Sequence, residues 1–425
     1  MDWVERDARV VWHGFTQMDC YADNAPVIVD RAEGRELIDV DGNRYLDAIS
    51  SLWVTTLGHR VPELDQALRE QIDRVAHSTL LGNGNRIVIE LAEALAKVVP
   101  VDHPHFLFAS DGASAVEQAL KIAFQYWANS NVQGRKTYLA FGEAYHGDTV
   151  GGLSLGGGGF GTEVFNPLRF PVLRAPSFKD PHALRSAANL IREHSHELAA
   201  VVVEPLVQGA AGMLIAPSNE FRHLQTACAE TGVLLICDEV ATGFGRTGTL
   251  FASEACGLRP DILCLGKGIT GGYLPMSATV ANERVFDAFR GADLSERTLY
   301  HGHSYGGNAL AASVALKHLQ LMNEWRVLDN VRERSAQLNT SLNQVAIASS
   351  CIRELRIAGL MCAIELASDE RPRFARRVCA VMTRRGVLAR SLGDNVILVP
   401  PLTITAAEID LIVQTFRESL AEVAG

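Results

Sequence analysis

The chain has 425 residues, of which 48% are hydrophobic and 21% charged, and its formal net charge is −10. This composition is typical of a globular protein and excludes a disordered chain, a collagen-like fibre and a coiled coil. The negative balance, without a run of Lys and Arg, argues against a nucleic-acid partner.

The first residues and the longest apolar stretch indicate whether the protein is secreted or enters a membrane. The N-terminus is acidic and lacks the basic and apolar regions of a secretory signal. The stretch from Leu198 to Pro217 contains Glu204 and Gln208, so it is not predicted to cross a bilayer. The eight cysteines have no CxxC spacing, which favours reduced, mostly buried thiols over disulfides or a zinc site. We expect a cytoplasmic protein that does not enter the membrane.

The predicted elements change character along the chain. Short extended segments around an Asp41-Gly42-Asn43 turn are predicted over 36–53, and helical periodicity begins near Pro62. From there to about residue 320, helical stretches alternate with continuous apolar runs at 106–109, 137–141, 199–205, 233–240 and 261–266. Such runs, bounded by turns, predict strands covered on both faces and therefore a mainly parallel sheet.

The tail differs from the centre. After Asn323 the pattern predicts helices at 326–345, 372–386 and 405–423, with a strand pair near 355–366. We therefore predict an α/β protein with a large domain over 62–323. A smaller α+β domain is predicted over 324–425, joined by the N-terminal segment 1–61.

Lys267 differs from the other five lysines, which lie in predicted helices or polar segments. It follows the apolar run DILCLG and stands between Gly266 and Gly268. The carboxyl end of a buried strand is where open α/β sheets bind ligands. Desolvation there lowers the pKa of an amine that must be neutral to form a Schiff base. The alternative is a strand-end lysine whose amine reaches solvent.

Asp238 ends the most apolar run of the chain, VLLIC, and Glu239 follows it. Burying such carboxylates costs free energy unless they have partners. The protonated pyridine nitrogen of pyridoxal phosphate (PLP) is one such partner, because it makes the ring an electron sink. The alternative is an acid with a metal-binding or structural role.

A possible phosphate site precedes these residues. Residues 106–127 predict a strand, a tight turn and a helix, and the amides of Gly112 and Ala113 lie at the helix N-terminus, which attracts anions. Tyr145, in AYHGDT, follows a strand ending near Phe141 and could stack on a flat cofactor. Each feature alone is weak, since many α/β loops look similar and a single tyrosine is more often part of a core.

Two other patterns are interpreted as non-functional. Gly156, Gly158 and Gly161 match the dinucleotide fingerprint G-x-G-x-x-G, but the segment GTEVFNPLRFPV after it is expected to be extended. His301 and His303 have no acidic or cysteine cluster beside them, so no metal site is predicted.

Taken in order, these features resemble the class III (fold type I) aminotransferases, which use PLP. The resemblance covers nearly the whole chain and rests on EPLVQGAAGM (204–213), DEVATGFGRTG (238–248), PDILCLGKGITGGYLP (260–275) and HGHSYGGNALA (301–311). It implies that Lys267 carries the imine with the cofactor, that Asp238 faces the pyridine nitrogen and that Tyr145 stacks on the ring.

The same resemblance implies a phosphate site shared between two subunits of a homodimer. Gly112 and Ala113 would hold the phosphate through backbone amides, and Ser304 would reach the phosphate of the neighbouring subunit's cofactor. The family usually has a hydroxyl residue at the place of Ala113, so the resemblance implies one phosphate hydrogen bond fewer in this chain.

Within the family, the segments VVWHGFTQM, SSLWVTTLGHR and HSTLLG are similar to those of the 7,8-diaminononanoate synthases of biotin biosynthesis, which aminate 8-amino-7-oxononanoate. By that likeness Phe15, Trp53 and Arg390 shape the substrate pocket, with Arg390 placed for the distal carboxylate. Arg246 is a further candidate for a polar contact, and a structural ion pair is the alternative for Arg390. The competing functions are an ω-amino acid:pyruvate aminotransferase on the same fold, a nicotinamide-dependent dehydrogenase and a catalytically silent binding protein.

Members of this group use S-adenosylmethionine or, in a subgroup, lysine as amino donor. Phe15, Leu52-Trp53 and Leu392 stand where the adenosylmethionine type tends to have a tyrosine, two adjacent tryptophans and an aromatic residue. Fewer aromatic faces and hydroxyls remain for a sulfonium-bearing adenosine, which favours lysine. Each side chain shifts specificity by only about 1–3 kcal/mol, so the donor is not fixed by them.

Overall fold

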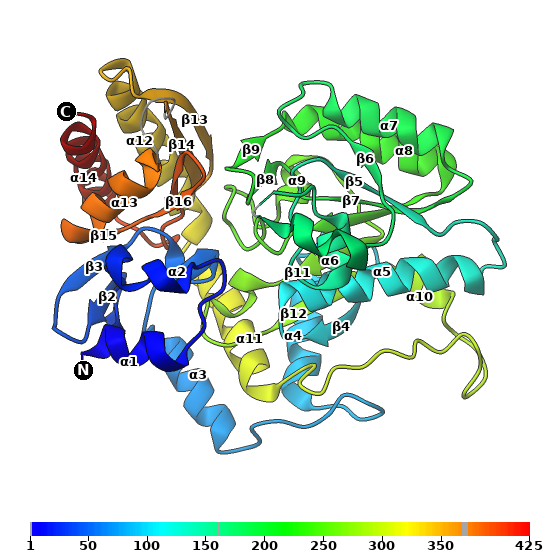
Figure 1. The fold of residues 1–425 in the computed structure, drawn as a ribbon. Helices are drawn as coiled ribbons and strands as arrows, with labels where there is room; N and C mark the ends of the chain where they lie inside the picture. The colour runs from blue at the N-terminus through cyan, green and yellow to red at the C-terminus, as the bar shows by residue number, and fades with distance from the viewer. Residues whose placement is uncertain (1, 160, 368–372) are drawn as a thin grey trace.

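A seven-stranded sheet forms the centre of the larger part of the molecule in a computed structural model, which describes residues 2–159, 161–367 and 373–425 (Figure 1). Its strand order is β4-β12-β11-β10-β7-β5-β6. The strands are β4 (His105–Ala109), β5 (Thr137–Phe141), β6 (Leu173–Ala175), β7 (Leu198–Val203), β10 (Leu234–Asp238), β11 (Ile262–Leu265) and β12 (Ser277–Ala281). β12 runs antiparallel to both neighbours and the other pairs are parallel. The predicted mainly parallel sheet is confirmed, and β6 and β12 are the two strands that none of the predicted apolar runs covers.

Helices cover both faces of this sheet. In β7, the side chains of Ala200 and Val202 lie on the face of the sheet that α5 (Gly112–Asn129) covers. Those of Val201 and Val203 lie on the opposite face. That opposite face packs against α4 (Arg86–Ala96), α7 (Ala183–Glu193), α8 (Arg222–Thr231) and α11 (Ala309–Glu324). Because successive side chains point to opposite faces and both faces are buried, the strands are apolar throughout. The carboxyl ends of the parallel strands meet at one edge.

The smaller part of the molecule contains both ends of the chain. An antiparallel sheet, β13-β14-β17-β16, packs with three helices. These elements are β13 (Ile352–Ala358), β14 (Met361–Leu366), β16 (Arg390–Leu392), β17 (Asn395–Leu398), α12 (Val327–Ile347), α13 (Phe374–Arg384) and α14 (Ala406–Ala424). They confirm the predicted helices and strand pair, except that residue 372 lies outside the described residues.

The N-terminal segment shares a sheet with the tail. The predicted turn at 41–43 joins β2 (Glu36–Asp39) to β3 (Arg44–Asp47), with β1 (Val29–Glu33) on the outside of β2. β15 (Val387–Leu388) pairs in parallel with β3 and completes this sheet. Figure 1 accordingly shows the blue N-terminal strands beside the orange and red C-terminal elements. The domain boundaries at 61/62 and 323/324 stay a prediction.

One local prediction is wrong. Residues 162–168 are predicted to be extended, whereas they form the 3₁₀ turn η3 (Thr162–Leu168) with Pro167 inside it. The fixed φ of proline suits such a turn as well as an extended chain. Gly156 follows the helix α6 (Val150–Leu155), so the glycines lack the strand-turn-helix context of a dinucleotide fingerprint.

Two chemical expectations can be compared with the fold. Buried free thiols are found at Cys228, Cys237, Cys256, Cys264, Cys362 and Cys379. Within the described ranges, no helix has both the length and the apolar character needed to span a membrane.

Candidate active site

Two adjoining cavities lie at the carboxyl edge of the large sheet. The first has a volume of about 500 Å³. Among its lining residues are Gly112, Ala113, Tyr145, Asp238, Lys267 and Trp53. The second, of about 480 Å³, shares Trp53, Tyr145 and Lys267 with the first and extends to Phe15 and Arg390. Parallel strands bring these residues together, because Gly112, Tyr145, Asp238 and Lys267 follow or end β4, β5, β10 and β11.

Lys267 presents its amine to both cavities. It begins the short turn η5 (Lys267–Thr270) with a positive φ of 41°, directly after β11. Its Nζ lies 4.7 Å from the centre of the Trp53 ring. Desolvation lowers the pKa of Lys267, while the charges of Asp238 and Glu204 act in the opposite direction. A lowered pKa increases the fraction of neutral, nucleophilic amine near neutral pH.

The two acids at the end of β10 have different partners. The Asp238 carboxylate is joined to His146 Nδ1 at 2.7 Å and accepts the Val240 amide at 3.0 Å, while it lines the first cavity. Glu239 is fully buried and accepts the amides of Ala252 at 2.8 Å and Ser253 at 2.6 Å. Glu239 therefore holds the start of α9 (Ala252–Ala255), and Asp238 is left as the carboxylate that can meet a protonated ring nitrogen.

The N-terminus of α5 is tightly packed at two glycines. A Cβ on Gly112 would lie 2.4 Å from Val240 Cγ1, and one on Gly147 would lie 2.5 Å from the Ala113 Cβ. A side chain at either position would clash with these neighbours, so both positions require glycine. The first amides of a helix have no intrahelical acceptor, so those of Gly112 and Ala113 are available to a phosphate. The Ser114 hydroxyl donates to the N-cap Asp111 at 2.8 Å, so it does not replace the hydroxyl missing at Ala113.

The polar side chains of Asp148, Glu204 and His146 line the first cavity and are not among the predicted site residues. Tyr145 donates its hydroxyl to Asp148 at 2.7 Å, and burial raises the pKa of Tyr145, which keeps the phenol neutral. Glu204 accepts the Tyr145 amide at 3.1 Å and the Gly209 amide at 3.0 Å. Burial raises the pKa of Glu204 to about 7. His146 is the third, bonded to Asp238. Glu204 directly follows an apolar strand, which is the signal that identified Asp238.

Arg390 lines the second cavity but not the first. Within the part of the chain that the structure describes, its exposed guanidinium has no hydrogen bond or ion pair, so the alternative of a structural ion pair has no support there. The second cavity, which Arg390 and Lys267 both line, is also lined by the apolar side chains of Phe15, Ile49, Leu52, Trp53, Leu392 and Ile397. A cation in the wall of a largely apolar cavity suits a carboxylate on a chain of methylenes.

The structure does not support a substrate contact for Arg246. This side chain is 1% exposed and lines neither cavity. Its Nη1 donates to the Pro400 carbonyl at 2.6 Å and its Nη2 to the Thr55 carbonyl at 2.9 Å. Desolvation lowers the pKa of Arg246 to about 9, and its positive charge contributes to the lowered pKa of Lys267.

Ser304 lies outside the cavities of its own chain. It is exposed, and its carbonyl accepts from His77 Nε2 at 2.8 Å. The contact with a neighbouring subunit's cofactor stays a prediction.

Comparisons with known proteins agree with this geometry. The family model described as aminotransferase class-III matches residues 18–420. An adenosylmethionine-8-amino-7-oxononanoate aminotransferase from Nitratidesulfovibrio vulgaris is 46% identical over 98% of this chain and 81% of that protein. The crystal structure of the Methanocaldococcus jannaschii protein of the same name has a TM-score of 0.95, 37% identity and 98% coverage of both chains. A PLP-bound amine transaminase from an uncultivated Pseudomonas species has a TM-score of 0.91 and 33% identity, covering 97% of this chain and 99% of that one.

Proposed function

Because the chain belongs to the class III aminotransferases, we propose that it transfers an amino group to 8-amino-7-oxononanoate and so makes 7,8-diaminononanoate for biotin biosynthesis. The observation that carries the proposal is Arg390, which has no polar partner among the described residues and lines the same largely apolar cavity as Lys267. The names of the relatives from Nitratidesulfovibrio and Methanocaldococcus support the same acceptor. A cytoplasmic location stays a prediction from the sequence.

The residues of the first cavity fit PLP, which supplies an aldehyde that bonds covalently to amines and a ring that takes up electrons. Asp238, held by His146, would pair with the ring nitrogen, and the Gly112 and Ala113 amides would hold the phosphate. Tyr145 lines the same cavity and would stack on the ring.

Lys267 would act twice. As a neutral amine it can bond to the cofactor. Once released, it would move the proton from the amine-bearing carbon of the donor to the cofactor carbon, and in the second half-reaction it would move a proton in the reverse direction, onto the acceptor carbon. Desolvation lowers its pKa toward the range in which one group both accepts and donates a proton.

The acceptor would be held at both ends. Arg390 would bind its carboxylate through paired hydrogen bonds, and the apolar lining would cover its methylenes. Donor and acceptor share Lys267, so the oxidised donor must leave before the acceptor enters, and ping-pong kinetics are expected.

Two donors remain in the proposal. Both of those relatives carry adenosylmethionine in their names, which favours S-adenosylmethionine. Phe15, Leu52 and Leu392 all line the second cavity, and this plain apolar wall favours lysine.

The test supplies holoenzyme with 8-amino-7-oxononanoate and each donor separately, and detects 7,8-diaminononanoate by mass spectrometry. Arg390→Met should raise the KM for this acceptor by about tenfold or more, since one charge-assisted pair is lost. Pyruvate serves as the comparison acceptor. Amination of pyruvate without amination of 8-amino-7-oxononanoate would replace the proposal by the ω-amino acid:pyruvate alternative.

A further inference from the structure

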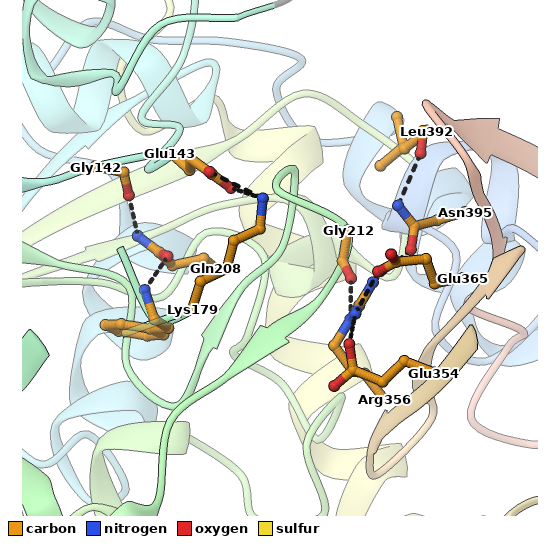
Figure 2. Close-up of polar contacts among 11 residues, drawn as sticks. Gly142, Glu143, Lys179, Gln208, Gly212, Glu354, Arg356, Glu365, Leu392 and Asn395 are labelled. Carbon is orange, nitrogen blue, oxygen red and sulfur yellow. Dashed lines mark hydrogen bonds and ion pairs between the residues drawn. The ribbon is translucent and has the colours of Figure 1, made fainter. Parts of the chain in front are cut away.

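Arg356, on β13, lies at the junction of the two parts of the molecule (Figure 2). Its Nε donates to the Gly212 carbonyl at 2.9 Å, and its Nη1 donates to Glu365 at 2.8 Å. The same guanidinium also donates to Glu354 and to the side-chain oxygen of Asn395. The side chain is buried and lines neither active-site cavity.

Two hairpins meet at Arg356. The first consists of β8 (Val207–Gln208) and β9 (Leu214–Ile215), and Ala210 in its turn lines both cavities. The second is formed by β16 and β17, and its residues Arg390 to Gly393 line the second cavity. The two hairpin turns are therefore parts of the wall around the substrate cavity.

A continuous set of hydrogen bonds joins the two turns. The Gly212 carbonyl is bound by Arg356, Arg356 is bound to Asn395, and the Asn395 amide donates to the Leu392 carbonyl at 3.1 Å. The two turns approach each other closely at Gly212 and Asn395. Gly212 has a φ of +89°, and a Cβ there would lie 2.8 Å from Asn395 Nδ2. Any movement of the second turn away from the first must break a bond to a buried charge.

Arg356 also compensates a local repulsion. Glu354 lies opposite Glu365 across the β13–β14 pair, and like charges in that position repel each other. The Arg356 Nη1 donates to both carboxylates. This role needs only a positive charge, whereas the bonds to Gly212 and Asn395 need the planar fork of an arginine.

We propose that Arg356 is a positioning residue for the acceptor: it holds the two hairpin turns together and so places Arg390 at the distance from Lys267 that fits the acceptor's carboxylate. The inference rests on the proposed function, because it assigns that carboxylate to Arg390.

The test replaces Arg356 by Met, which keeps the length of the side chain and removes its donors. In the holoenzyme, the acid:ester ratio of kcat/KM is measured with 8-amino-7-oxononanoate and its methyl ester, which is neutral and cannot form an ion pair with Arg390. We expect the ratio to fall about tenfold through the KM for the acid, with kcat nearly unchanged, because a displaced Arg390 forms weaker charged hydrogen bonds.

Two further variants complete the design. Asn395→Leu breaks the outer part of the bond network without touching either glutamate, should show the same loss, and carries the test if Arg356→Met does not fold. Arg385→Met removes another doubly paired arginine, which is bonded to Glu418 and Glu422 on α14, and should leave the ratio unchanged. Equal losses toward acid and ester in the first two variants would overturn the proposal, since they would show a general structural role.

Amide hydrogen exchange over residues 390–395 gives a readout that does not depend on the substrate. Exchange should be faster in Arg356→Met than in the parent holoenzyme. If the parent does not aminate 8-amino-7-oxononanoate, the proposed function fails, and faster exchange still supports the positioning of the hairpin. Unchanged exchange overturns the positioning role in either case.

Discussion

The acids that follow the apolar strands β7 and β10 have separate roles that their hydrogen bonds define. Glu239 bonds to backbone amides away from the cavity, and Asp238 faces it with His146 as partner. Glu204 accepts two backbone amides, yet burial raises its pKa to about 7. Burial therefore stabilises the protonated form of Glu204 in the folded chain, beside the Lys267 amine.

This pKa predicts a pH dependence of stability. The carboxyl pKa rises from 4.5 to about 7 on folding, so between these values the folded chain binds more protons than the unfolded chain. The contribution of Glu204 to the free energy of unfolding is fully present below pH 4.5. As the pH rises from 4.5 to about 7, this contribution falls by roughly 3 kcal/mol. Glu204→Gln should lack this part of the fall in urea unfolding followed across that range. Parallel pH profiles of variant and parent would contradict the prediction.

The second prediction at this scale concerns Lys267. Lys267→Ala should keep the fold, retain weak cofactor binding and lose turnover by several orders of magnitude, because no other lysine lines either cavity. Steady-state turnover and far-ultraviolet circular dichroism are the measurements. Lys97→Ala, on the exposed surface at the end of α4, is the control and should behave as the parent. Substantial turnover in Lys267→Ala would show that another group is the nucleophile.

These residues show which parts of the site can be predicted from the sequence and which cannot. Lys267 and Asp238 could be found because a charged residue at the end of an apolar strand is conspicuous, and Glu204 carries the same signal. His146 and Asp148 could not be found, because their roles depend on contacts with Asp238 and Tyr145. The motif makes Arg246 only a candidate for a polar contact with the substrate, whereas its guanidinium binds two carbonyls inside the fold, a role that the motif does not reveal.

At the scale of elements, the segment Ser50–Trp53 has an unusual backbone. Its four residues have positive φ values of 51°, 57°, 147° and 67°. Residues other than glycine rarely adopt such a conformation, because their side chains clash with the backbone. The buried Asp47 accepts the Ser51 amide at 3.1 Å and pairs with His59 Nε2 at 3.0 Å, and the Ser50 hydroxyl donates to Val399 at 2.6 Å. These bonds hold Leu52 and Trp53 in the cavity wall.

We predict that Asp47→Asn lowers the free energy of unfolding by about 1–3 kcal/mol, because a charged acceptor of several hydrogen bonds is replaced by a neutral one. It should also lower kcat/KM, since the place of Trp53 beside Lys267 depends on this segment. Urea unfolding and steady-state kinetics measure the two effects. Asp41→Asn, in the exposed turn after β2, is the control. An unchanged midpoint in Asp47→Asn would show that the segment does not need this carboxylate.

The same scale explains which elements were predicted. β5, β7, β10 and β11 are continuous apolar runs, and the pattern identified each of them. β12 was missed because its residues Ser277 and Thr279 look polar, although both are buried. The Thr279 hydroxyl donates to the Ala115 carbonyl of α5 at 2.8 Å, so its burial depends on a helix far away in the sequence. The positive φ values of Ser50–Trp53 gave no sign in the sequence, because no glycine occurs there.

At the scale of the whole molecule, the exposed Ser304 predicts a homodimer with shared sites. Tyr300 and Tyr305 beside it are 65% and 62% exposed, and large exposed apolar side chains in a cluster are typical of interfaces. A dimer by light scattering is the first expected result.

A hybrid dimer provides the sharper measurement. In a dimer of one Lys267→Ala chain and one Ser304→Ala chain, shared sites leave one site with both native residues, and that site should bind PLP as tightly as the parent. Ser304→Ala alone should weaken PLP binding at both sites by about tenfold, the effect of one charge-assisted hydrogen bond. If Ser304 served its own chain, the hybrid would contain no complete site and no tight binding.

The pairing of β3 with β15 also dictates an order of events during synthesis. Leu46 pairs with Val387, which leaves the ribosome 341 residues later. At elongation rates of about 5–20 residues per second, the nascent β3 edge waits roughly 20–70 s for its partner. The seven strands of the large sheet end at Ala281, so the cradle for the cofactor can close while Arg390 has not yet been translated. The residues of this chain that would hold the cofactor's ring and bond to its aldehyde are thus translated before Arg390, and the unpaired β3 edge is the part of the growing polypeptide that a chaperone has most reason to cover.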